Sequence, residues 1–313
     1  MPRSEAFCPA GISSFFEVCD HDEAGNALED PARIGARGGG FATTRGVTCS
    51  VSAKSQSRTQ IQVGINSKQF PNATTTRSAV ERLLEVAGVH ADVRATIQVD
   101  VPIAAGFGTS AAGTLATCLA LSDALKLPLT FNELGRITHI AEVINGTGLG
   151  TVSALLSGGF VLVTEPGAPG IGRVDRLRFP PNHSVVCAHL GPILTRDVLA
   201  KRANGNGNEA AKTTLDNILM KPTLPIFLAE ARKFGRKSGL ETARVTRLIS
   251  TMMAAGAVGA AQNMIGEAVH AVADDSKVTR ILGEVKRVFP DAKVFASPLD
   301  NRGVRLLRAK AKH

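Results

Sequence analysis

Two glycines and two hydroxyl residues stand together in the segment 106–110, which reads Gly-Phe-Gly-Thr-Ser. Glycine has no side chain, so the backbone of this segment can approach an anion closely. The Ala- and Leu-rich residues from Ser110 to Leu125 contain no proline and predict a buried helix. The first turn of a helix offers unpaired N–H groups and the positive end of its dipole, so this arrangement suits a phosphate group. The alternative is an ordinary glycine turn into a helix that Ser110 caps.

A histidine and a carboxylate, His139 and Glu142, form a second candidate set. The capping box at 130–133 predicts the start of a helix that contains both, and residues three apart share one face of a helix. For His139 alone, a place in the core or at the surface is the simpler interpretation. A glycine-rich stretch at 145–151 follows this helix and leads to an apolar segment at 158–163.

The elements around the glycine segment are read from side-chain periodicity. Residues 93–99 alternate and are rich in β-branched side chains, which predicts a strand directly before the segment. Alternation also predicts strands at 46–53 and 59–65, joined by a polar turn. The apolar spacing at 72–87 predicts an amphipathic helix.

Two regions near the N-terminus are less regular. Residues 5–18 hold two short apolar runs broken by Pro-Ala-Gly, which is compatible with a β-hairpin that has a proline turn. Residues 35–40, Gly-Ala-Arg-Gly-Gly-Gly, predict a loop because glycines reach conformations that side chains forbid.

The second half of the chain is predicted to be mostly helical, with a domain change near residues 180–190. Helices are expected at 224–236, 241–254, 257–272 and 277–288. Strands are expected at 173–177, 184–190, 293–296 and 304–307.

The composition describes a globular chain without a membrane span. Of its 313 residues 44% are hydrophobic and 20% are charged, and no apolar run reaches the length of about 18 residues that a spanning helix needs. The first residues show no apolar signal-peptide core. The five cysteines are odd in number and widely spaced, which indicates reduced thiols in a cytoplasmic protein and no disulfide frame.

The net charge of +9 is uneven, with five basic and no acidic residues in the tail 301–313. The chain has no tryptophan or tyrosine for base stacking, so a nucleic-acid partner is not expected. A solvated basic tail or a general affinity for anionic substrates is the preferred interpretation.

The glycine segment is part of a longer motif that resembles a known family. Residues 102–112 read Pro-x-x-x-Gly-Phe-Gly-Thr-Ser-Ala-Ala, similar to the second motif of the GHMP kinases, Pro-x-x-x-Gly-Leu-Gly-Ser-Ser-Ala-Ala. The segment is no Walker loop, since no Gly-Lys-Ser/Thr follows, and it lacks the third glycine of a dinucleotide fingerprint. The resemblance implies that this loop binds the phosphates of ATP through Pro102, Gly106, Phe107, Gly108, Thr109, Ser110, Ala111 and Ala112.

Three further stretches narrow the resemblance to the pantoate kinases within that family. These are 9–17 (Pro-Ala-Gly-Ile-Ser-Ser-Phe-Phe-Glu), 35–40, and 147–152 (Thr-Gly-Leu-Gly-Thr-Val). By this resemblance Ser110 and Glu142 are ligands of Mg²⁺, and Ser110, Glu142 and His139 are the catalytic residues. It also implies that substrate is bound by Ser13, Arg37, His139 and Thr195. A third, glycine-rich motif of the family would fall at 296–303, which holds a single glycine.

The resemblance covers nearly the whole chain and implies an α+β, two-domain GHMP kinase fold. Residues 1–185 would form the nucleotide-binding N-terminal domain, which is ribosomal protein S5 domain 2-like, and residues 186–313 a ferredoxin-like C-terminal domain. The active site would lie in the cleft between them. The oligomeric state stays open, with a homodimer as one candidate.

The implied reaction transfers the γ-phosphoryl group of ATP to the primary hydroxyl of pantoate, a step of archaeal coenzyme A synthesis. Three positions depart from the pantoate-kinase pattern: Ala36 replaces a serine, Thr151 an aspartate and Val163 an arginine. Two alternatives therefore stay open. Beside the pantoate kinase, these are a nucleotide-binding homologue with weak or no kinase activity and a GHMP kinase for another small hydroxy acid.

Overall fold

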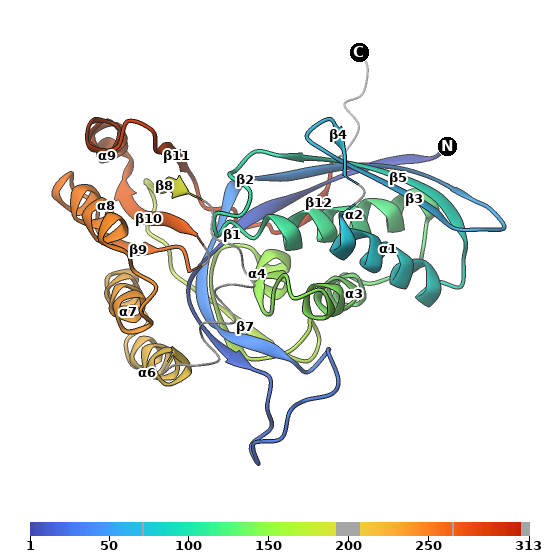
Figure 1. Cartoon of the computed structure of the whole chain (residues 1–313), viewed down its shortest axis with the longest axis horizontal. Coiled ribbons are helices and arrows are strands. Elements are labelled where there is room, and N and C mark those ends of the chain that lie inside the picture. The colour runs from blue at the N-terminus through green and yellow to red at the C-terminus, as the bar shows by residue number, and fades with distance from the viewer. Residues whose placement is uncertain (71, 192–206, 265, 308–313) are drawn as a thin grey trace.

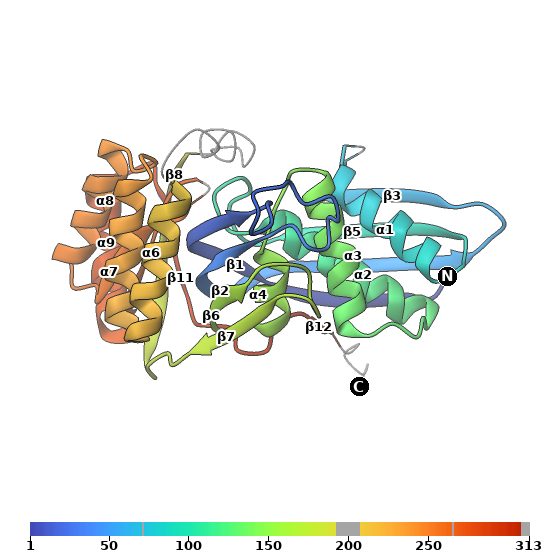
Figure 2. The same cartoon turned by 90° about the horizontal axis from the view of Figure 1, so that it is seen from below.

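The computed structural model describes residues 1–70, 72–191, 207–264 and 266–307. Within them the chain forms two β-sheets that lie side by side, each covered by its own helices (Figures 1 and 2). The mixed helix and strand content confirms the α+β class that the sequence predicts. The second sheet begins with β8 at His183, and the division at residues 185 and 186 stays a prediction.

The larger sheet is built on two long antiparallel strands, β1 (Arg3–Cys19) and β2 (Gly35–Ser55). Strand β2 pairs with β6 through its first residues and with β5 through its last residues. It therefore connects these two parts of the sheet. The order is β12-β1-β2-β5-β3-β4, with β6 beside β2 and β7 beside β6. The other strands are β3 (Gln60–Ile65), β4 (Lys68–Gln69), β5 (Ala91–Val99), β6 (Phe160–Glu165), β7 (Arg173–Leu177) and β12 (Arg305–Leu306).

Helices cover one face of this sheet (Figure 1). They are α1 (Thr74–Val86), α2 (Thr109–Leu125), α3 (Phe131–Ile144) and α4 (Thr151–Ser157). Helix α2 lies on β1 and β2 and is also contacted by α1 and α3. It is apolar on every side, as expected of a helix enclosed between a sheet and two other helices. The core helix that positions the candidate loop is therefore held on all sides.

The smaller sheet has the order β11-β8-β10-β9, and all its pairs are antiparallel. Helices α7, α8 and α9 pack on strands of this sheet, while α6 packs on α7 and on β1 of the larger sheet, which α7 also contacts. Its strands are β8 (His183–Gly191), β9 (Gly259–Gln262), β10 (Glu267–Asp274) and β11 (Lys293–Ser297). Its helices are α6 (Gly207–Met220), α7 (Leu224–Lys237), α8 (Ala243–Ala254) and α9 (Asp275–Val288). A phenylalanine cluster from β1, β2, β6 and α7 joins the two halves: Phe15, Phe41, Phe160, Phe227 and Phe234.

The predicted helix at 257–272 is wrong, because this stretch forms the hairpin of β9 and β10. Its small alanine-rich side chains favour a helix by intrinsic propensity. Both faces of the two strands are buried, so the polar alternation that marks a half-exposed strand is missing. Tertiary packing therefore overrides local propensity here.

The expectations for the N-terminal region also need correction. Residues 5–18 are one continuous strand and no hairpin, and Pro9 lies at a register shift between β1 and β2, where a bulge tolerates proline. Residues 35–40 belong to β2 and form no loop. A Cβ atom at Gly40 would lie 1.7 Å from the carbonyl oxygen of Ile12, so the glycines allow a close approach of β1.

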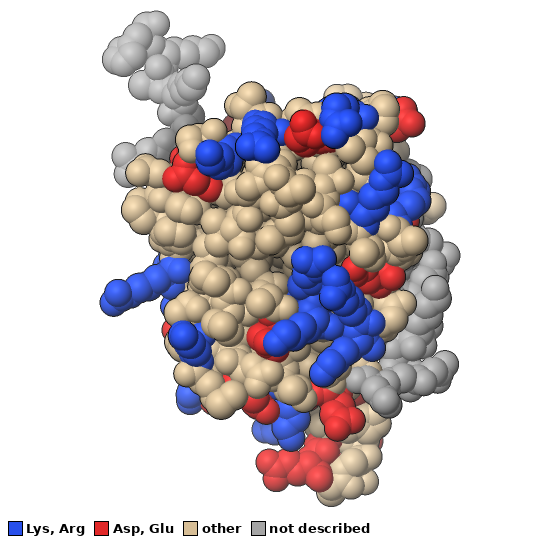
Figure 3. Space-filling view, turned by 90° about the vertical axis from the view of Figure 1, so that its left-hand side faces the viewer, with Lys and Arg blue, Asp and Glu red and all other residues tan. Residues whose placement is uncertain are grey.

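Helix α7 carries a group of basic side chains, in addition to the basic residues of the C-terminal tail. Figure 3 shows Lys and Arg side chains gathered at the level of this helix, and its last two turns carry Arg232, Lys233, Arg236 and Lys237.

Among the described helices, none is long and apolar enough to cross a membrane.

Candidate active site

The glycine segment forms a loop between the end of β5 and the start of α2. Its φ angles are positive at Ala104 (56°), Gly106 (74°) and Gly108 (59°), with the residues between them in the ordinary region. A backbone that alternates in hand in this way turns successive N–H groups into a concave anion-binding site. Ala104 is strained in this conformation, and such strain is typical of functional loops.

Gly108 is the N-cap residue of α2, and no side chain caps this helix. The interpretation that Ser110 caps the helix is therefore wrong. A Cβ atom at Gly108 would lie 2.8 Å from Cγ2 of Thr151 and 3.1 Å from the carbonyl oxygen of Gly11. The position needs glycine both for its left-handed backbone and for the space around it.

The hydroxyl of Ser110 donates instead to Glu142 of α3, with an Oγ–Oε1 distance of 2.5 Å. The same carboxylate oxygen accepts a hydrogen bond of 2.8 Å from Thr147 Oγ1. A Cβ atom at residue 148 would lie 2.3 Å from Oε2, so Gly148 leaves this carboxylate oxygen uncrowded. Ser110, Glu142 and Thr147 thus bring three oxygen-bearing side chains to the first turn of α2.

Glu142 is only 2% exposed. Burial raises the pKa of its carboxyl group, while the hydrogen bonds from Ser110 and Thr147 act in the opposite direction. A buried carboxylate without a basic partner is costly unless a cation joins it. Such groups are frequent at functional sites.

The donor set fits a magnesium ion. Mg²⁺ prefers oxygen ligands, and it commonly takes one or two carboxylates from the protein and the rest from phosphates and water. Glu142 and Ser110 supply a carboxylate and a hydroxyl, as the resemblance implies. No group of three or more His, Cys, Asp or Glu side chains able to hold a metal lies within the described ranges, so a tightly caged metal site is not found there.

A cavity of about 260 Å³ opens beside this carboxylate. It is lined by β1, the start of β2, the glycine loop, the first turn of α2 and the segment 147–155. Of the residues that the sequence assigns to ATP and metal, most line this cavity: Gly106, Phe107, Gly108, Thr109, Ser110, Ala111 and Glu142. Pro102 and Ala112 are not among the described lining residues, and Ala112 lies in the core.

Of the four substrate-binding residues predicted from the sequence, two lie at the cavity. Ser13 and Arg37 line the cavity. The guanidinium of Arg37 forms two hydrogen bonds of 2.9 Å with the carboxylate of Glu17, which raises its pKa. Among the described lining residues, Arg37 is the one with a positive charge. Thr195 lies outside the described residues.

His139 is not brought into the cavity. It is 1% exposed, and its Nε2 atom lies 2.8 Å from the carbonyl oxygen of Ile34. Burial lowers its pKa, so the ring is neutral at pH 7. The contact supports the core interpretation of this histidine, and the function proposed below does not use it.

The three positions that depart from the pantoate-kinase pattern, Ala36, Thr151 and Val163, all line the same cavity. A Cβ atom at Gly150 would lie 3.2 Å from that of Ala36, and the methyl of Thr151 lies against both Gly11 and Gly108. Ala36 and Val163 are apolar and Thr151 is uncharged, so none of the three places a charge on this part of the cavity wall.

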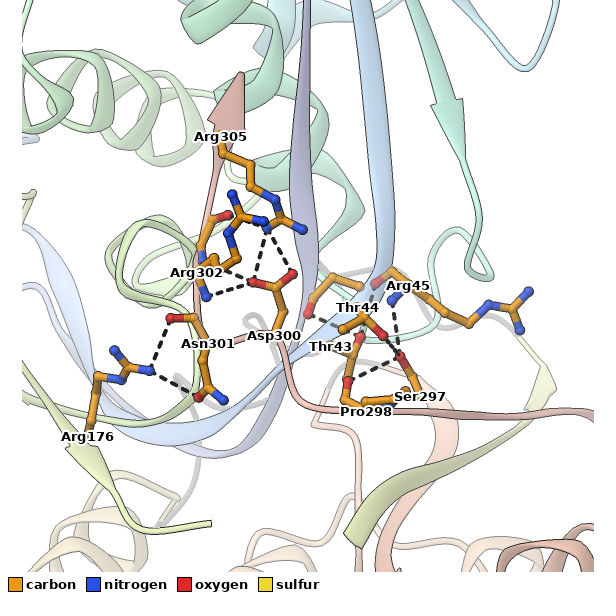
Figure 4. Close-up of polar contacts among 12 residues, drawn as sticks. Thr43, Thr44, Arg45, Arg176, Ser297, Pro298, Asp300, Asn301, Arg302 and Arg305 are labelled. Carbon is orange, nitrogen blue, oxygen red and sulfur yellow. Dashed lines mark hydrogen bonds and ion pairs between the residues drawn. The ribbon is translucent and has the colours of Figure 1, made fainter. Parts of the chain in front are cut away.

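Residues 296–303, where a third family motif was expected, brace the fold (Figure 4), and none of them is among the described residues that line this cavity. Asp300 accepts hydrogen bonds from Arg305 and from the N–H groups of Arg302 and Gly303. Ser297 bonds Thr44 in β2. This loop joins β11 of the smaller sheet to β12 of the larger one.

Thr147 and Gly148 are site residues that the sequence assignment omits, although their motif at 147–152 is visible in the sequence. The turn between β9 and β10 also reaches the site, because Met264 donates a backbone hydrogen bond of 3.0 Å to Ser13. The sequence interpretation missed this turn because the stretch was predicted to be helical.

Comparison with known proteins agrees with this geometry. Residues 74–159 match the family model described as GHMP kinases N terminal domain. The chain is 29% identical to the pantoate kinase of Thermococcus kodakarensis, covering 93% of this chain and 95% of that protein. It is also 29% identical to the pantoate kinase of Methanospirillum hungatei, covering 91% and 93%. A solved phosphotransferase related to the CoA biosynthesis pathway superposes with a TM-score of 0.83 at 25% identity, covering 98% of this chain and 99% of that one.

The matched domain, the two-sheet fold and the glycine loop are features that this chain shares with the GHMP kinase superfamily. Within that superfamily it is similar to the pantoate kinases along nearly its whole length. The resemblance identified from the sequence is confirmed.

Proposed function

We propose that this protein transfers the γ-phosphoryl group of ATP to the hydroxyl of a small hydroxy acid, and that the acid is pantoate. The observation that carries the proposal is the hydrogen bond between Ser110 and Glu142 at the first turn of α2, beside the glycine loop. The pantoate kinase relatives support the choice of acceptor. The reaction would supply a phosphorylated acid for coenzyme A synthesis.

The glycine loop would bind the nucleotide phosphates through backbone N–H groups and the N-terminus of α2. Ser110 and Glu142 would hold Mg²⁺, which supplies neutralisation of the phosphate charge when bound. The positioning of both reactants and the stabilisation of charge would account for most of the rate enhancement, as in other phosphoryl transfer enzymes.

Arg37 would contribute to the binding of the acceptor. Its guanidinium lines the cavity while its carboxylate partner Glu17 holds it in place. A guanidinium has further N–H donors, so a substrate carboxylate can add to the pair. Ser13 would offer a hydroxyl on the same wall.

The second candidate function is a nucleotide-binding homologue with little turnover. It is favoured by Thr151 and Val163, which line the cavity where the resembled pattern has an acid and an arginine. A threonine hydroxyl can orient an acceptor but cannot accept its proton as a carboxylate would.

ADP release with ATP and Mg²⁺ tests both candidates, measured in parallel with pantoate, mevalonate, homoserine and shikimate. The proposal predicts release that depends on pantoate. Release with another acid alone would indicate a GHMP kinase of different specificity. Binding of ATP with no release for any acid would favour the second candidate.

A further inference from the structure

A chain of buried polar side chains connects the smaller sheet to the glycine loop. Ser14 Oγ lies 2.8 Å from Nε2 of His270, and His270 Nδ1 lies 2.9 Å from Oδ1 of Asn263. Asn263 Nδ2 donates to the carbonyl oxygen of Ala105 at 3.3 Å. Ser14, His270 and Asn263 are fully buried. Ala105 belongs to the loop that lines the cavity.

The donor and acceptor roles in this chain are fixed by its last bond. A carbonyl oxygen can only accept, so the amide nitrogen of Asn263 must face Ala105 and its oxygen must face His270. His270 therefore carries its proton on Nδ1, and Nε2 accepts from the hydroxyl of Ser14. Every bond runs in one direction, from Ser14 to the loop.

The last bond also sets the direction of an N–H group in the loop. In a trans peptide the carbonyl and the following N–H point to opposite sides, so fixing the Ala105 oxygen on Asn263 points the Gly106 N–H the other way. Within the described parts of the chain, this N–H donates no hydrogen bond to a protein group. Gly106 lines the cavity, so its N–H is free for a ligand there.

Gly266, which directly precedes β10 of the smaller sheet, lies close to the same peptide. A Cβ atom at Gly266 would lie 2.7 Å from the carbonyl carbon of Ala105. The Phe107–Gly108 peptide, two positions further along, is held from the other side, because Gly11 donates to the carbonyl oxygen of Phe107 at 3.1 Å. Alternate carbonyls of the loop are thus bound to protein on two sides.

We propose that Asn263 and His270 are positioning residues that hold the glycine loop in its phosphate-binding conformation by fixing the Ala105 carbonyl. Neither touches the cavity, and both act through the Ala105–Gly106 peptide. The proposal rests on the proposed function only for its ligand, the phosphates of a nucleotide. The polarised chain strengthens the Gly106 N–H as a donor.

The test replaces Asn263 by the isosteric aspartate, which keeps the acceptor for His270 but removes the donor to Ala105. Calorimetry should show ATP affinity reduced about 10-fold in Asn263→Asp and by less than about threefold in Ser14→Ala, which lies at the far end. The matched control is Asn217→Asp, which removes an amide bond to Glu230 away from the loop and should leave ATP affinity unchanged.

A readout without nucleotide keeps this proposal separate from the proposed function. The amide resonance of Gly106 in the nucleotide-free protein should shift in Asn263→Asp and stay in place in Asn217→Asp. If the wild-type protein binds no ATP, a shifted resonance still supports the positioning role while the proposed function fails.

An unmoved Gly106 resonance in folded Asn263→Asp overturns the proposal, whatever happens to ATP affinity. If that variant does not fold, Gly266→Ala displaces the same peptide with no loss of a polar group. It should shift the same resonance, and an unmoved resonance would again overturn the proposal.

Discussion

The Oγ atom of Ser110 lies 2.5 Å from Oε1 of Glu142, so the first turn of α2 meets the last turn of α3 at a buried carboxylate. A negative charge near the C-terminus of a helix opposes the helix dipole. Burial opposes the charge as well. The position therefore costs stability, which is expected where a cation and phosphates complete the site.

The substitution Glu142→Gln should stabilise the protein above the unfolded-state pKa of a glutamate. Burial raises the folded-state pKa of Glu142, so the free energy of unfolding of the wild type falls as pH rises through that pKa. The glutamine amide does not ionise, so this loss of unfolding free energy is absent from the variant. Its oxygen still accepts the hydrogen bond from Ser110. Thermal unfolding should show a gain on the order of 1 kcal/mol at pH 7.5 and little gain at pH 4. A loss of stability at pH 7.5 would contradict this view of the carboxylate.

The same variant should lose the magnesium-dependent part of ATP binding. We expect affinity with Mg²⁺ to fall by roughly 10- to 150-fold, as for a charge-assisted bond, while affinity without the metal changes little. The control is Glu133→Gln in the exposed capping box of the same helix, which should leave both affinities unchanged. Equal losses with and without metal would indicate a folding defect.

The substitution Gly108→Ala should weaken ATP binding by about 10-fold or more. The new methyl would meet Cγ2 of Thr151 and occupy the wall of the cavity. Gly88→Ala is the matched control, because Gly88 has a similar positive φ of 65° but nothing within 4 Å of the added Cβ atom. Both variants should lose about 1 kcal/mol of stability from backbone strain, and calorimetry should show lost affinity only at 108. Unchanged affinity in folded Gly108→Ala would place the phosphates elsewhere.

The double variant Thr151→Asp, Val163→Arg should phosphorylate pantoate faster than the wild type. Both side chains line the cavity, where a carboxylate could take up the hydroxyl proton and a guanidinium could grip the acceptor's carboxylate. The gain should appear in turnover, by up to about 10²- to 10⁴-fold, with ATP affinity nearly unchanged. High wild-type activity with pantoate would show that these positions are not limiting.

The substitution His270→Gln should make the free energy of unfolding decrease less steeply as the pH is lowered. Burial lowers the pKa of His270 to about 3, against about 6.5 in the unfolded chain, so its contribution is complete above pH 6.5 and is lost as pH falls toward 3. From pH 6.5 to 5 this loss is about 2 kcal/mol in the wild type. Urea unfolding should show a slope smaller by about 1.4 kcal/mol per pH unit in the variant. Parallel slopes for the two proteins would contradict the buried neutral histidine.

The central unit of strand, glycine loop and helix is predictable from the sequence because its signals are local. Residues 93–99 alternate, and the glycines at 106 and 108 stand where the backbone turns left-handed. The partnership of Ser110 with Glu142 came from the resemblance, since two residues on different helices share no local pattern.

The errors lie where long-range packing decides. Gly38 and Gly40 look like loop residues, yet they let β1 and β2 approach as paired strands. The hairpin of β9 and β10 is buried on both faces, so its alanine-rich sequence reads as a helix. Its contacts with Ala105 depend on a residue pair 158 positions apart, which no periodicity reports.

Mass spectrometry of products formed from ATP, Mg²⁺ and pantoate tests the central claim most directly. We expect phosphorylated pantoate in a one-to-one ratio with ADP in the wild type, and none above background in Glu142→Gln. ATP hydrolysis without phosphorylated pantoate, or equal product from both proteins, would contradict it.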